Sequence, residues 1–144
     1  MMDGTELARC ATTARLLEAA GVAALWGLAM SVLAIFLLVH GHLRPNFALV
    51  GSVIAALLGL PERYFAFRIR FDAGLFKDMA RGTIFSLTAL DQALNEAGLR
   101  RSTSRLRSLD ERLLGARQLI KRHSALVACQ SLALTAALLN QWFL

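Results

Sequence analysis

The stretch Gly21–Val39, GVAALWGLAMSVLAIFLLV, is nineteen residues long and contains no charged side chain. As an α-helix it would be about 28 Å long, close to the roughly 30 Å hydrocarbon core of a bilayer. A second uncharged run, Phe47–Leu60, ends at Pro61, and a third run, Ser124–Leu144, has twenty-one residues. These runs predict an all-α integral membrane protein with three transmembrane helices. We place the spans at residues 21–40, 47–61 and 124–144.

The composition also favours a membrane protein. Hydrophobic residues make up 56% and charged residues 18% of the 144 residues, whereas soluble domains are nearer about 45–50% and 25%. Most of the basic residues behind the net charge of +6 flank the spans. We interpret them as topology signals and contacts for anionic lipid headgroups, and we expect no nucleic-acid binding. Because Asp3, Glu6 and Glu18 precede the first run, we expect a retained span and not a signal peptide.

The distribution of Lys and Arg predicts the orientation. Residues 1–20 carry two, the short loop at 41–46 carries one, and residues 62–123 carry thirteen. Basic segments stay on the cytoplasmic side, so we expect residues 62–123 and the N-terminus there, with the loop and the C-terminus outside. Many Arg, Ala and Leu residues and very few Lys are typical of GC-rich bacteria. We therefore favour the bacterial inner (cytoplasmic) membrane, with the mitochondrial inner membrane as the second choice.

Small residues recur at four-residue spacing in each predicted span. In lipid, such residues let helix backbones approach closely. We expect the first two spans to form an antiparallel hairpin through a turn at Gly41. An Ala-rich chain also produces such stripes by chance, which is the alternative interpretation. The predicted packing residues are Ala23, Gly27, Ser31, Gly51, Ala55, Gly59, Cys129 and Ala133.

Residues 62–123 predict a basic, cytoplasmic, antiparallel helical hairpin between spans two and three. Apolar residues return at helical spacing after Pro61, Gly98 is a plausible helix stop, and Ser102 or Thr103 could cap the second arm. The predicted contact residues of this hairpin are Ile84, Leu87, Leu94, Leu106, Leu109, Leu113 and Ile120.

An amphipathic helix is also expected over residues 1–20, because Asp3-x-x-Glu6 resembles a capping box. Leu7, Cys10, Ala14 and Leu17 lie on one face of this helix.

Arginine and aromatic residues alternate after Pro61, a pattern that suits a helix lying at a membrane interface. We therefore expect Arg63–Phe71 to lie along the membrane surface, with a bend at Gly74 or Gly82. Glu62 and Arg63 are interpreted as a solvated pair at headgroup level; a buried functional pair is the alternative. The predicted interface or docking residues are Arg63, Tyr64, Phe65, Phe67, Arg68, Arg70 and, at the hairpin tip, Arg100 and Arg101.

No motif for catalysis, phosphate binding or metal binding is present in the sequence. His40 and His42 have no carboxylate or thiol nearby, and His123 lies at the opposite end of a span, so we expect no metal or cofactor. Cys10 and Cys129 are interpreted as packing residues.

The leading functional hypothesis is a non-enzymatic scaffold or accessory subunit that forms a homo-oligomer or binds another membrane protein. The alternative is a small homo-oligomeric channel or permeation protein. A haem- or metal-binding subunit is the hypothesis that the residues favour least.

Overall fold

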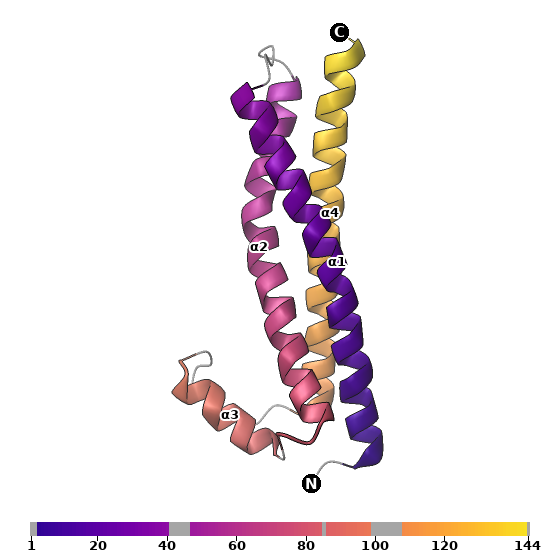
Figure 1. Cartoon of the computed structure of the whole chain (residues 1–144), viewed down its shortest axis with the longest axis vertical. Helices are drawn as coiled ribbons and strands as arrows, with labels where there is room; N and C mark the ends of the chain where they lie inside the picture. The colour runs from indigo at the N-terminus through magenta and orange to yellow at the C-terminus, as the bar shows by residue number, and fades with distance from the viewer. Residues whose placement is uncertain (1–2, 41–46, 85, 99–107, 144) are drawn as a thin grey trace.

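The computed structural model describes residues 3–40, 47–84, 86–98 and 108–143, and these residues form four helices and no strand. Helices α1 (Gly4–His40), α2 (Phe47–Ala80) and α4 (Leu109–Phe143) lie side by side in one bundle, while the short α3 (Leu87–Glu96) projects from its lower end (Figure 1). Each of the three long helices is long and apolar enough to cross a membrane. The prediction of an all-helical protein with three such helices is therefore confirmed.

Each long helix has two parts of different character. We call residues 21–40, 47–61 and 124–143 the apolar half of the bundle, and residues 4–20, 62–80 and 109–123 the polar half. The N-terminus lies at the polar end and the C-terminus at the apolar end (Figure 1). The two halves share the same three helices, so the bundle is continuous across the boundary.

Helix α1 begins with the predicted capping box. The Asp3 N–H donates to Glu6 Oε2 at 3.1 Å, and the Glu6 N–H donates to Asp3 Oδ1 at 2.7 Å. Hydrogen bonds from the Thr5 hydroxyl and the Glu6 N–H lower the pKa of the Asp3 carboxyl below its usual value. The buried face of α1 consists of Cys10, Ala14, Leu17, Ala24, Gly27, Ser31 and Ala34.

Helix α2 corrects the prediction of a segment on the membrane surface. It continues through Pro61 and Gly74 without a break, so Arg63–Phe71 stands in the bundle. The physical reason is an inward face repeated every three or four residues, which packs against α1 and α4. This face in the polar half consists of Glu62, Ala66, Ile69, Ala73, Phe76 and Met79.

The helical segment predicted to end at Gly98 is interrupted, and the break lies at Gly82, one of the two positions where a bend was predicted. The chain turns at Arg81–Ile84, where Gly82 has a φ of 70° and its N–H donates to the Met79 carbonyl. A positive φ suits glycine because it has no Cβ. The Ser86 hydroxyl then caps α3 by accepting from the N–H groups of Thr88 and Ala89.

The predicted tip of the hairpin, with Ser102, Thr103, Leu106, Arg100 and Arg101, lies outside the described residues, as do Gly41 and His42. The two predicted hairpins, one of the first two spans and one over residues 62–123, therefore stay predictions.

The polar half has the larger hydrophobic core. Leu109 and Leu113 are buried there, and Ile84, Leu87, Leu94 and Ile120 pack at its edge. The apolar half has a smaller cluster built on Ala34, Ala55 and Leu134.

The backbones of α2 and α4 come close at Gly51. A Cβ added there would lie 2.9 Å from the Ala133 carbonyl oxygen and 2.9 Å from the Ala137 Cβ. Cys129, however, is exposed, so the predicted stripe on α4 was wrong at that position. The inward face of α4 mixes polar, large apolar and small residues: His123, Val127, Gln130, Leu134 and Ala137.

We expect a Gly51→Ala variant to be less stable, because the methyl group would press on the Ala133 carbonyl oxygen. Overpacking of this kind costs about 1–3 kcal/mol. The measurement is thermal unfolding in mild detergent, followed by the helical circular dichroism signal. Gly21→Ala is the matched control, since nothing lies within 4 Å of a Cβ added there. Equal losses in both variants would contradict the close approach.

Candidate functional site

Glu62 is fully buried between the three long helices. It lies one residue after Pro61, and its place in the helical repeat of α2 puts it on the same inward face as Ala55, Gly59 and Ala66. The interpretation of Glu62 as a solvated residue at headgroup level was therefore wrong. Glu62 is buried because the helical repeat of α2 places it on the packed face, where a side chain is removed from water whatever its charge.

Two side chains hold the Glu62 carboxylate. His123 Nε2 on α4 lies 2.9 Å from Glu62 Oε1, and Arg63 Nε donates to Glu62 Oε2 at 2.6 Å. Arg63 also donates to the backbone carbonyl of Ala24 on α1. Since a charge in an apolar interior is costly unless paired, these contacts are what make the buried carboxylate tolerable. They also join α1, α2 and α4 at one level.

Glycine on α1 provides the space for the carboxyl group. A Cβ added to Gly27 would lie 2.7 Å from Glu62 Cδ, closer than real Cβ atoms come to other atoms. A side chain at this position would require the Glu62 carboxyl group to shift. Gly27 was predicted as a helix-packing residue, and the structure places it against a carboxyl group.

A second polar contact lies further toward the apolar end. Gln130 Nε2 on α4 donates to Ser31 Oγ on α1 at 2.7 Å, and Ser31 Oγ donates to the Gly27 carbonyl at 3.0 Å. Gly59 on α2 lies directly against the Ser31 hydroxyl. Gln130 is two helical turns, about 10 Å, beyond His123 along α4. We call the side chains of these two buried contacts together the polar cluster: Glu62, Arg63, His123, Ser31 and Gln130.

The polar cluster is closed on the side of the apolar end. Ala34, Ala55 and Leu134 lie beyond it and are at most 1% exposed. Ser52 is buried beyond this apolar layer, and its hydroxyl has no hydrogen-bond partner among the described residues. The layer therefore separates Ser52 from the polar cluster.

Some polar atoms of the cluster remain unpaired. His123 Nδ1 and Gln130 Oε1 are buried and have no hydrogen-bond partner in the part of the chain that the structure describes. An ionised carboxylate only accepts hydrogen bonds, so the contact with His123 requires a proton on Nε2 or on the carboxyl group.

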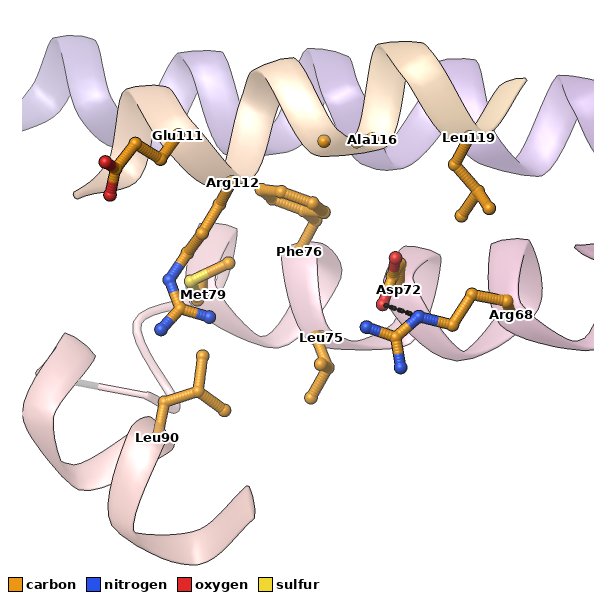
Figure 2. A pocket seen from close by; sticks show the side chains of 11 residues that line it. Arg68, Asp72, Leu75, Phe76, Met79, Leu90, Glu111, Arg112, Ala116 and Leu119 are labelled. Atoms are coloured by element: carbon orange, nitrogen blue, oxygen red, sulfur yellow. Dashed lines mark ion pairs between the residues drawn. The ribbon is translucent and has the colours of Figure 1, made fainter. Parts of the chain in front are cut away.

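A cavity of about 170 Å³ lies between α2, α3 and α4 in the polar half (Figure 2). The guanidinium groups of Arg68 and Arg112 lie on either side of Leu75 and point toward the side of α3. Arg68 pairs with Asp72 at 3.5 Å, and Arg112 forms an ion pair with Asp91 of α3. The cavity is smaller than most small-molecule sites, which occupy about 300–1,000 Å³. Arg112 holds α4 to α3, whereas Arg68 pairs within α2, so each arginine of the cavity already has a carboxylate partner.

Metal binding finds no support in the described residues, where no group of three His, Cys, Asp or Glu side chains could hold an ion. His40 stacks on Phe36 with ring centroids 4.8 Å apart. It is the last residue of α1, in the apolar half, whereas His123 lies on α4 in the polar half.

Comparisons with protein-family models, curated proteins and solved structures gave no match to this chain. The site must therefore be judged on its own geometry.

The predicted site residues fall into separate places. Ser31 and Arg63 belong to the polar cluster, and Gly27 and Gly59 adjoin it, whereas Ala23 is only partly buried. The aromatic rings of Tyr64 and Phe67 point outward, Phe65 is half-buried, and Arg70 is exposed.

Sequence analysis missed Glu62, His123 and Gln130 as partners. A usable signal was present in α4, because His123 and Gln130 are seven residues apart and continue the spacing of Leu109, Leu113 and Ala116.

We expect Glu62→Ala to lower the free energy of unfolding by about 3 kcal/mol, because it leaves Arg63 and His123 without their partner. The measurement is a denaturant titration in mixed micelles. Glu18→Ala is the matched control, since Glu18 forms an exposed ion pair with Lys77, and exposed pairs contribute little. Similar losses in the two variants would contradict a special role for the buried carboxylate.

Proposed function

We propose that the protein is a non-enzymatic scaffold or accessory subunit of a membrane complex. The observation that carries this proposal is the polar cluster, whose hydrogen bonds run between the helices of the bundle itself. Contacts of this kind fix one arrangement of the helices, as buried polar groups do where they specify register. A bundle of fixed shape suits a protein that positions another protein.

The exposed surface supports the same proposal. In the apolar half, large apolar side chains such as Val22, Leu57 and Leu132 face outward, as expected for contact with lipid or with a neighbouring membrane helix. In the polar half, the exposed basic residues include Arg70, Arg81, Arg117, Lys121 and Arg122. A basic segment of this kind favours a bacterial inner-membrane protein whose polar half lies on the cytoplasmic side. It offers contacts to anionic headgroups or to an acidic surface of a partner.

The proposal predicts a defined assembly. The full-length protein, purified in mild detergent, should have the native mass of a fixed homo-oligomer or of a complex with another membrane protein. Glu62→Ala should reduce this assembly, because the helices lose their fixed arrangement, whereas Glu18→Ala should leave it intact. A wild-type monomer with no bound protein would overturn the proposal.

A second candidate, a small homo-oligomeric channel, is favoured by one observation. Polar atoms of Ser52, Gln130 and His123 are buried without partners among the described residues, as groups lining a path would be. Against it, Ala34, Ala55 and Leu134 close the interior between Ser52 and Gln130.

Ion flux separates the two functions. Proteoliposomes with the wild-type protein should show no proton or potassium flux above protein-free vesicles if the apolar layer closes the interior. A flux that rises further in Leu134→Ser would establish the channel instead, since hydrophobic constrictions gate by excluding water.

A further inference from the structure

A second hollow lies on the outer surface, in the groove between α1 and α2. It has a volume of about 460 Å³, within the range of ligand-binding sites. Gly21 on α1 and Gly74 on α2 help to form it, and a Cβ added to either would meet nothing within 4 Å. The space beside these two glycines is therefore open.

The lining of the groove changes from apolar to basic along its length. Val22 and Leu25 line one end and are 69% and 59% exposed. Arg70 and Lys77 line the other end. Lys77 pairs with Glu18 at 2.9 Å, whereas Arg70 has no ion pair or hydrogen-bond partner among the described residues. The groove therefore offers one cation that no carboxylate neutralises.

The contacts between α1 and α2 place this cation at the boundary between the two halves. Arg63 reaches the Ala24 carbonyl, and Lys77 reaches Glu18. Arg70 is midway between Arg63 and Lys77 on α2, about 10 Å from each along the helix axis. It therefore lies near the level of Gly21, where the uncharged stretch of α1 begins. In a bilayer, phosphate groups of lipids lie just outside this boundary.

We propose that this groove binds one phospholipid with an anionic headgroup. Its phosphate would pair with Arg70, and an acyl chain would lie over Val22 and Leu25. Arginine suits a phosphate because its planar fork can donate two parallel hydrogen bonds. An anionic lipid is favoured over a zwitterionic one because the unneutralised charge of Arg70 leaves the site positive. The site does not depend on whether the protein is a scaffold or a channel.

Native mass spectrometry of the full-length protein in mild detergent tests this site. The protein would receive equal amounts of phosphatidylglycerol and phosphatidylcholine. We expect one retained phosphatidylglycerol per chain, and about fivefold weaker retention in Arg70→Gln, the effect of one basic residue near an anionic surface. Arg117→Gln is the matched control. Arg117 is exposed on α4, lies outside the groove and has no ion pair among the described residues.

A second variant tests the shape of the groove without changing its charge. Gly74→Leu places a side chain into the open space, so phosphatidylglycerol retention should fall while helical content is kept. Equal retention of the two lipids by the wild type would overturn the proposal, as would equal effects of Arg70→Gln and Arg117→Gln. Displacement of phosphatidylglycerol by an equal concentration of inorganic phosphate would also overturn it, since the site would then take the free anion.

Discussion

The structure depends on the burial of one carboxylate. Glu62 is fully removed from solvent at the level where the polar and apolar halves of the bundle meet. An isolated buried charge is so costly that the chain must supply partners. It does so from two helices, with Arg63 on α2 and His123 on α4, and Arg63 in turn donates to the α1 carbonyl of Ala24. These contacts join all three long helices at one level.

Several features of the sequence follow from this constraint. Gly27 leaves room for the carboxyl group, and Gly59 leaves room for the Ser31 hydroxyl that accepts from Gln130. Small residues in a membrane helix are often explained by close approach of backbones alone. Here two of them accommodate polar side chains, whereas Gly51 does allow the backbones of α2 and α4 to approach. The free-energy cost of burying polar groups is thus offset by hydrogen-bond partners, and Gly27 and Gly59 leave the room that these polar groups need.

The same constraint bears on function. Because the partners of Glu62 and Ser31 come from within the bundle, the interior is used for holding helices together. The outer surface remains for other molecules, with an apolar region, an exposed basic region and the groove between α1 and α2. This division of roles favours a protein that acts by contact with lipid and with other subunits.

Sequence analysis succeeded where the signal is local. Uncharged runs revealed the three long helices, and the Asp3–Glu6 spacing revealed the cap of α1. It failed at Glu62, because the partner His123 is sixty-one residues away along the chain and no local pattern joins them.

The break after α2 shows a different limit. Gly82 was considered as a bend, but the expected helix still ran on to Gly98, since apolar spacing continues on both sides of the turn. Spacing alone does not distinguish one long helix from two shorter ones. Cys129 was misplaced because a stripe of small residues need not be the face that packs.

A double-mutant cycle between Glu62 and His123 tests the central claim most directly. The free energies of unfolding of Glu62→Gln, His123→Gln and the double variant would be compared with that of the wild type in mixed micelles. Residues in one buried hydrogen-bonded network are coupled by about 0.5–3 kcal/mol, and the account predicts a coupling energy in that range. Additive effects of the two substitutions, within about 0.3 kcal/mol, would show that the two side chains are not in contact and would contradict the account.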